Sequence, residues 1–393
     1  MNLILKELEK SSKYNDFIKN LENKKSPIAI SGLTGVAEAS IIAKCLEQTK
    51  RPIFIITYNE IQAQALVNDL KFFTEDVAYL PKKEIITYDY VAESKNLPYE
   101  RIEILNKIYK KQKLIIVTSV ETIKQKIISK DTLYKNVLKF KVGDRCDLEV
   151  LKQKLVDLGY QRFDLIDGRG EFSVRGGIID ISTTESTGIR IELWGDEIDS
   201  IRHFNIISQR SIDNIEKIEI FPAHEYILET SIEKVAKNIS NNVYPENISE
   251  KVESDLEKIC NGEYISKIDR YFNSFYGKQE TVLEYIDDKY LVFVDEFNKV
   301  IQRSENIEQD NENTIKALME KGRIIPDSLK NYVATENLRA VLRSSDGGCK
   351  CHRAAGRAHE ADDECSPLHH SSRDASNQRG ESRQVSNIKI RQR

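Results

Sequence analysis

The sequence has no long hydrophobic run and no strong excess of charge. Its 393 residues contain no stretch of 18 or more apolar residues, so no transmembrane helix is predicted. Residues 1–21 carry charges throughout and are typical of an amphipathic helix, not of a signal peptide with an apolar centre. We therefore expect a cytoplasmic protein without a membrane partner. The formal net charge of -4 gives no reason to predict nucleic-acid binding from overall charge.

The main part of the chain also lacks cysteines at metal-ligand spacing. Cys45, Cys146 and Cys260 are far apart in the sequence. Isolated cysteines of this kind are typical of reduced, buried residues in a cytosolic protein. The sequence therefore predicts no metal site here and no disulfide framework.

Arginine and histidine are scarce up to about Arg343 and then become frequent. Residues 344–393 contain four of the six histidines and show neither helical nor strand periodicity. Such a segment buries too little apolar surface to offset its ordering entropy, so we expect a disordered or out-of-frame terminus. Its cysteines and histidines suggest zinc superficially, but their spacing fits no standard ligand pair: Cys349, Cys351, His352, His359, Cys365, His369 and His370.

Up to residue 135, apolar runs alternate with helical patterns, which is typical of a parallel sheet covered by helices on both faces. From about Phe140 a helix is followed by short strand-like segments separated by Gly, Asp and Ser turns. A further buried strand, YLVFVDE at 290–296, fits the first sheet. The fold class predicted is α/β, interrupted by a small inserted β-rich domain.

A glycine turn at GLTGVAEA, residues 32–39, follows the first apolar run and precedes a helical pattern. A phosphate-binding loop has the form G-x-x-x-x-G-K-[ST], in which lysine neutralises the phosphates and the hydroxyl binds magnesium. The corresponding positions from Gly32 onward hold Ala37, Glu38 and Ala39, with Thr34 and Gly35 inside the loop. A glutamate in place of the lysine would repel phosphate. We therefore predict a degenerate loop that does not bind ATP.

Asp295 and Glu296 end the apolar run VFVDEF, as the magnesium-binding carboxylates of ATPases do. Because the loop lacks the lysine and the hydroxyl, we expect no bound nucleotide for these carboxylates to act on. We interpret them as a degenerate second nucleotide motif, and we predict no catalytic residue in the chain.

Several stretches in consistent order resemble the N-terminal module of the bacterial transcription-repair coupling factors, which is related to the excision-repair protein UvrB. They are GLTGVAEA, ITYDYVAESKNLPYERIEIL, GYQRFDLIDGRGEFSVRGGIIDI, IRIELWGDEIDSIRHFN, SQRSIDNIEKIEIFPAHEY and LEYIDDKYLVFVDE. UvrB itself is the poorer match because its loop keeps the lysine and because only ten residues separate Tyr90 from Arg101, too few for its β-hairpin.

The resemblance implies a RecA/UvrB-like organisation and a recruiting function. In the family the inserted domain binds UvrA, whereas the polymerase-binding and motor domains, with their ATP and magnesium, lie beyond this module. RNA polymerase and DNA would then be reached only through those other domains. The implied organisation is domain 1a at 1–135, the inserted UvrA-binding domain at 136–224, domain 1b at 225–325, the start of a linker domain at 326–343 and an atypical tail at 344–393.

Matching motifs in the inserted domain carry the family's UvrA-binding positions to Arg175, Arg190 and Trp194, with Glu192 and Arg169 as weaker neighbours. Arginine and tryptophan are frequent interface hot spots. Strand alternation places Arg190, Glu192 and Trp194 on one face. The alternative is that Arg190 and Glu192 form a surface ion pair and Trp194 belongs to the core.

The resemblance predicts a module that recruits UvrA to stalled transcription complexes without hydrolysing ATP. Two alternatives stay open at this stage. The module could retain the nucleotide or DNA binding of a UvrB-like helicase, or the chain could be a non-functional fragment.

Overall fold

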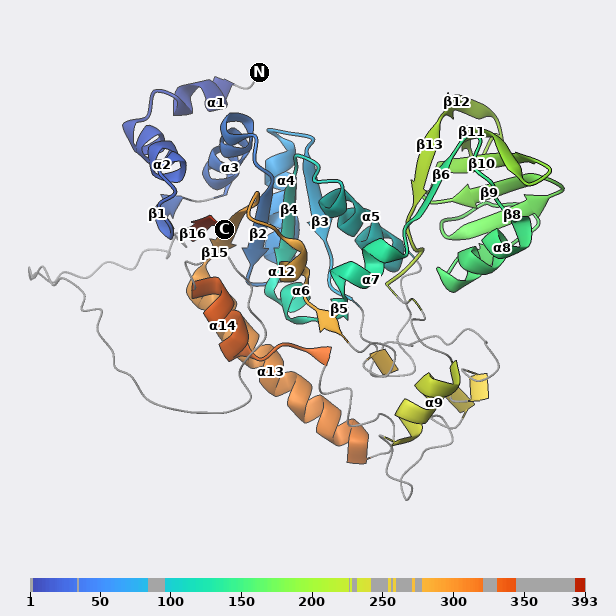
Figure 1. Ribbon diagram of the computed structural model, residues 1–393. Coiled ribbons are helices and arrows are strands. Elements are labelled where there is room, and N and C mark those ends of the chain that lie inside the picture. The colour runs from blue at the N-terminus through green and yellow to red at the C-terminus, as the bar shows by residue number, and fades with distance from the viewer. Residues whose placement is uncertain are drawn as a thin grey trace, which may run out of the picture.

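The computed structural model describes residues 3–33, 35–83, 96–225, 227, 232–241, 254–255, 257–258, 271–272, 278–320, 331–343 and 386–392. Within these ranges the chain forms an α/β domain and an inserted β-rich domain (Figure 1). No helix of the described residues is long and apolar enough to span a bilayer.

The α/β domain is built on a six-stranded sheet of order β1-β16-β15-β2-β4-β3. Four neighbouring strands, β15, β2, β4 and β3, are parallel, as the sequence predicts. The strand bounds are β1 Ile28–Leu33, β2 Ile53–Thr57, β3 Val77–Leu80, β4 Ile115–Ser119, β15 Leu291–Asp295 and β16 Ser386–Gln392.

Helices cover both faces of this sheet, since successive strand residues enter different cores. Ile53 and Ile55 of β2 pack into a cluster with α2, α3 and α4, whereas Phe54 and Ile56 pack into a cluster with α5 and α12. The helices of the domain are α1 Leu3–Leu8, α2 Ser12–Glu22, α3 Val36–Thr49, α4 Glu60–Lys71, α5 Leu97–Tyr109, α6 Val120–Lys124, α7 Lys130–Lys135, α9 Ile232–Asn241, α12 Val282–Tyr285, α13 Phe297–Glu320 and α14 Thr335–Arg343. A two-stranded ribbon joins β5 Ile127–Ile128 to β14 Gln279–Glu280.

The N-terminus differs from the single amphipathic helix expected for residues 1–21. The structure has two helices there, because Ser11 begins a new one: its side-chain oxygen accepts a hydrogen bond from the backbone N–H of Tyr14 at 3.4 Å. Tyr14, Phe17 and Leu21 of α2 then pack against α3 and α4.

Strand β16 is the second difference from the sequence prediction. The sequence analysis expects no regular structure in residues 344–393, yet Ser386–Gln392 lies antiparallel between β1 and β15 (Figure 1). Isoleucine at 388 and 390 gives this short segment a strand-like alternation, and two neighbouring strands supply backbone partners. The expectation of disorder is therefore wrong for these seven residues. Residues 344–385, including the Cys and His cluster considered for zinc, lie outside the described residues.

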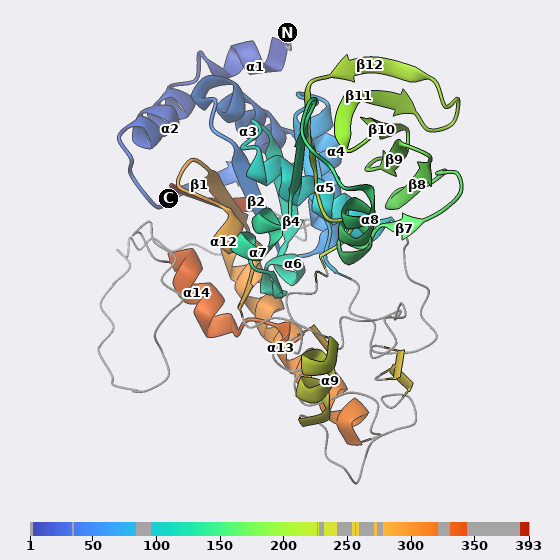
Figure 2. The same cartoon turned by 45° about the vertical axis from the view of Figure 1, so that its right-hand side comes forward.

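The inserted domain contains a six-stranded mixed sheet of order β12-β11-β10-β9-β8-β7 with one helix beside it (Figure 2). Its elements are α8 Leu148–Asp157, β7 Gln161–Arg162, β8 Glu171–Arg175, β9 Ile178–Ser182, β10 Thr187–Trp194, β11 Glu197–Asn205 and β12 Ser211–Ile215. The chain enters along β6 Leu138–Lys141 and leaves along β13 Lys217–Ile220, and these two strands pair antiparallel. This arrangement is that of an insertion, and the domain has its own hydrophobic core.

Cys45 and Cys146 are buried free thiols, in agreement with their interpretation as structural residues. Cys260 lies outside the described residues, as do several segments between 226 and 277 in the range expected for domain 1b.

Candidate functional site

The first candidate surface is on the inserted sheet, where two arginines converge on one buried carboxylate. Arg190 Nε donates to Asp180 Oδ1 at 2.6 Å and Arg190 Nη2 to Asp180 Oδ2 at 2.9 Å, while Arg175 Nη2 donates to Oδ2 at 2.6 Å. Asp180 is fully buried, and its hydrogen bonds raise the pKa of Arg190. The guanidinium of Arg190 also lies 4.5 Å from the ring centroid of Phe204.

Burial distinguishes these two arginines. The Arg190 side chain is 15% exposed, whereas that of Arg175 is 48% exposed. Arg190 therefore mainly neutralises Asp180 inside the sheet. About half of the Arg175 side chain stays exposed to solvent, where it is accessible for further contacts. Asp180 was missed in the sequence analysis, although a lone carboxylate within the apolar run GIIDIST is a signal that a cation must lie opposite it.

Replacing Arg190 by alanine is expected to destabilise the inserted domain. Asp180 would keep only Arg175, so a loss of about 1–3 kcal/mol in the free energy of unfolding is expected for a buried charge left partly unpaired. R175A should cost less, because Arg190 retains both carboxylate oxygens. Urea unfolding of both variants measures the difference, and equal losses would contradict this assignment of roles.

Trp194 lies at the end of β10 and is 84% exposed, so it is not a core residue. The tip of the β8–β9 hairpin reaches this position closely: the Leu193 N–H donates to Gly177 O at 2.8 Å, and a side chain at Gly177 would collide with the Leu193 carbonyl. The same tip follows Arg175, the last residue of β8. The structure thus brings Arg175 and Trp194 to one end of the inserted sheet.

The two weaker candidates have other partners. Glu192 forms an ion pair with Arg202 and accepts a hydrogen bond from Ser200 at 3.0 Å, so the alternative of an Arg190–Glu192 pair is not what the structure shows. Arg169 is 14% exposed and lies between the domains, 3.8 Å from a carboxylate oxygen of Glu103 on α5. Arg169 therefore faces a carboxylate of the α/β domain. The register of β10 against β11 shifts between Glu192 and Leu193, so the regular alternation expected to place Trp194 on the face of Arg190 is interrupted there.

The second candidate site is the degenerate nucleotide loop. Gly35, Glu38, Asp295 and Glu296 line one cavity of about 280 Å³, between the start of α3 and the ends of β2 and β15. The structure thus unites both degenerate motifs, as their sequence positions suggest. Gly32 lies within β1 and does not line this cavity, and Thr34 falls outside the described residues.

Acidic side chains dominate the cavity, which is the reverse of a phosphate site. Glu38 is 1% exposed, and burial followed by the charges of Asp295, Asp69 and Glu296 raises its pKa to about 8. Burial and Glu296 raise the pKa of Asp295 to about 6, against the opposing influence of Gln62 and Lys299. A triphosphate here would meet several carboxylates, so the residues present do not fit ATP and magnesium.

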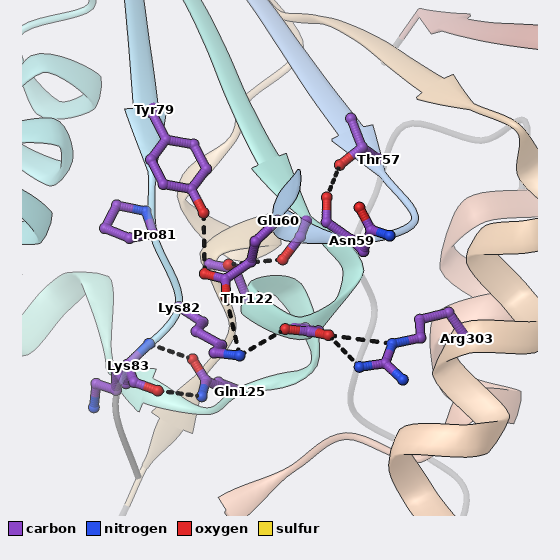
Figure 3. A network of polar contacts seen from close by, with 12 residues as sticks. Thr57, Asn59, Glu60, Tyr79, Pro81, Lys82, Lys83, Thr122, Gln125 and Arg303 are labelled. Atoms are coloured by element: carbon purple, nitrogen blue, oxygen red, sulfur yellow. Dashed lines mark hydrogen bonds and ion pairs between the residues drawn. The ribbon is translucent and has the colours of Figure 1, made fainter. Parts of the chain in front are cut away.

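Next to the cavity, beyond the carboxyl ends of the parallel strands, charged side chains pair with one another in a network (Figure 3). Lys82 Nζ lies 2.9 Å from Glu60 Oε2 and 2.8 Å from Glu121 Oε2, and Arg303 contacts Glu121 at 2.5 Å. Tyr79 donates to Glu60 Oε1 at 3.0 Å. Because these groups satisfy one another, this network is structural, and the cavity beside it holds the uncompensated carboxylates.

Comparisons with known proteins concern the inserted domain and the chain as a whole. Residues 138–226 match the family model described as the UvrB interaction domain. The chain is 30% identical over 354 residues to the transcription-repair-coupling factor of Bacillus subtilis (strain 168), covering 85% of this chain and 30% of that protein. It is also 30% identical to the transcription-repair-coupling factors of Staphylococcus aureus (strain USA300) and Staphylococcus epidermidis (strain ATCC 12228), over 75% of this chain and 26% of each relative. The chain therefore spans less than a third of the length of these relatives.

Proposed function

We propose that this chain, a homologue of the transcription-repair-coupling factors that carries a UvrB interaction domain, is a docking module in transcription-coupled repair. Its inserted domain captures a repair protein, and we infer from the family resemblance that this partner is UvrA. The observation that supports this most directly is that the exposed Trp194 and the half-exposed Arg175 lie at the same end of the inserted sheet. A large, rigid aromatic side chain and a partly free guanidinium are the residue types that most often provide interface hot spots.

The proposal assigns no ATP hydrolysis to this module. Glu38 occupies the lysine position of the phosphate loop, and the adjoining cavity is acidic. Recruitment in this proposal depends on the inserted domain alone, and contacts with RNA polymerase and DNA belong to other domains of the family.

Replacing Trp194 by alanine is expected to weaken UvrA capture about 30-fold, because truncation of a tryptophan hot spot typically costs 2 kcal/mol or more. The matched control is F72A, which removes an aromatic side chain that is 75% exposed at the end of α4 in the other domain. Calorimetric titration of purified UvrA into the full chain measures both affinities.

R175A provides a second measurement on the same surface and should also weaken binding, with R190A compared only after its stability is known. Wild-type affinity in W194A and R175A, with native circular dichroism, would show that UvrA does not use this end of the sheet. A similar loss in F72A would point to a non-specific apolar contact.

A further inference from the structure

The cavity at the degenerate loop is a small chamber with both acidic and aromatic walls. Its lining comes from α3, α4, the start of α13 and the ends of β2 and β15: Gly35, Glu38, Tyr58, Gln62, Ala65, Leu66, Asp69, Asp295, Glu296 and Lys299. Its volume of about 280 Å³ suits a small organic molecule. Glu296 turns the chain from β15 into α13 with a left-handed φ of 54°, a strained conformation for a non-glycine residue and one that is frequent at binding sites.

Two of the buried carboxyl groups have too few hydrogen-bond donors. Asp295 and Glu38 are each 1% exposed, and among the described residues no donor reaches Oε1 of Glu38. The side chain of Gln62 approaches Asp295 and lowers its pKa, but neither oxygen of Asp295 has a donor in full hydrogen-bond geometry. Buried polar groups are normally paired, because leaving one unsatisfied costs about 1–3 kcal/mol. Both residues line the cavity, so a molecule inside it can supply the missing donors.

The cavity wall already accommodates one ammonium group. Lys299 Nζ lies 5.2 Å from the ring centroid of Tyr58 and 3.6 Å from Glu296 Oε1, and its side chain is 38% exposed. Lys299 is the single basic residue among the lining residues, against four acidic ones. The charge and the aromatic face of the chamber therefore both favour additional positive charge.

We propose that this cavity binds an aliphatic polyamine, with its ammonium groups on the carboxylates of Glu38 and Asp295 and its methylene chain along Tyr58, Ala65 and Leu66. A single metal ion fits less well, because the described residues contain no group of three or more His, Cys, Asp or Glu side chains placed to hold one. Separated ammonium groups can pair with carboxylates on different walls, and each N–H donates a charge-assisted hydrogen bond. In this proposal a cation binds at the position where an intact phosphate loop binds an anion.

This binding should strengthen as pH rises. The charged or titratable groups facing Glu38 and Asp295 are Asp69 on α4, Glu296 after β15 and Lys299 on α13. The pKa of Asp295 is raised to about 6 and that of Glu38 to about 8, so both carboxyls become fully charged only above these values. An ammonium ligand stabilises the charged forms and therefore displaces protons when it binds.

The test is calorimetric titration of spermidine into the full chain at constant ionic strength, at pH 6 and pH 8. We expect one site that binds several-fold more tightly at pH 8. E38Q and D295N should each weaken binding at least tenfold, whereas E75Q, which changes an exposed glutamate that does not line the cavity, should bind like the wild type. Circular dichroism establishes that each variant is folded, and E296Q replaces D295N if that variant does not fold.

Three outcomes would overturn the proposal. Equal spermidine affinity in the wild type, E38Q and D295N would mean non-specific attraction to an acidic protein. Stoichiometric Mg²⁺ binding that displaces spermidine and is lost in E38Q would mean a metal site. ATP binding that depends on Asp295 would mean that the loop still serves a nucleotide.

Discussion

Removing residues 386–392 is expected to lower the free energy of unfolding of the α/β domain by on the order of 5 kcal/mol, since each lost backbone hydrogen bond contributes roughly 0.5–1.5 kcal/mol. Strand β16 pairs with β1 on one side, where Ile28 faces Ile390, and with β15 on the other, where Phe293 faces the same residue. Among the described strands β1 pairs only with β16. Without β16, β1 would therefore lose its connection to the sheet.

Urea unfolding of a chain ending at Arg343, together with hydrogen exchange of the amides of β1, measures this effect. Proline at Ile388 should destabilise the full chain similarly, because proline cannot donate to a central ladder, and proline at Val385, before the strand, is the matched control. A synthetic peptide covering 385–393 should restore protection to β1 in the shortened chain. An unchanged urea midpoint after truncation would contradict the strand's role.

Replacing Glu225 by glutamine is expected to destabilise the protein by about 3–5 kcal/mol, the usual cost of removing one partner from a buried ion pair. Arg101 Nε donates to Glu225 Oε1 at 2.5 Å, and Lys83 Nζ lies 3.5 Å from Oε2. Glu225 is 3% exposed and Arg101 1% exposed. Glutamine would remove the negative charge that both Arg101 and Lys83 contact.

The pH dependence of this effect follows from the pKa of Glu225. Burial acts to raise that pKa, but Arg101 and Lys83 outweigh burial and hold it below the ordinary value. A carboxyl with a depressed folded-state pKa contributes stability above its unfolded-state pKa of about 4.3 and loses it as pH falls through the folded-state value. E225Q should therefore flatten the acid side of the stability profile.

Thermal unfolding between pH 3 and pH 7 measures this change. The matched control is E219Q on β13, whose partner Lys139 lies 3.3 Å away at the surface and whose loss should cost under about 1 kcal/mol. Equal effects of the two substitutions would mean that the buried Arg101–Glu225 pair stabilises the protein no more than the surface pair does.

The sequence predicts the parallel strands well because each is a continuous apolar run that must be buried on both faces. Phe54 and Ile56 pack into one hydrophobic cluster, and Ile53 and Ile55 pack into the other. A short, continuously apolar segment of this kind is typical of a central strand that is buried on both faces. Strand β16 was missed because its place is fixed by two neighbouring strands more than by its own pattern, of which Ile388 and Ile390 are the only apolar members.

The candidate sites show the same limit. Substitution of the loop lysine by Glu38 is visible in the sequence, but the cavity that joins Glu38 to Asp295 depends on how α3 and β15 meet in space. Likewise, Arg190 and Trp194 can be selected as hot-spot residue types from sequence. Only the structure shows that Asp180 holds Arg190 inside the sheet, while Trp194 projects from its end.

The paired strands β6 and β13 have a consequence for the history of this architecture. Leu138 faces Ile220 across that ribbon, so the inserted domain begins and ends at adjacent points in space. A whole domain can then be added, exchanged or removed by recombination at neighbouring positions, without extending or reordering the sheet that receives it. The inserted domain could thus evolve as a transferable unit, separately from the α/β domain that carries it.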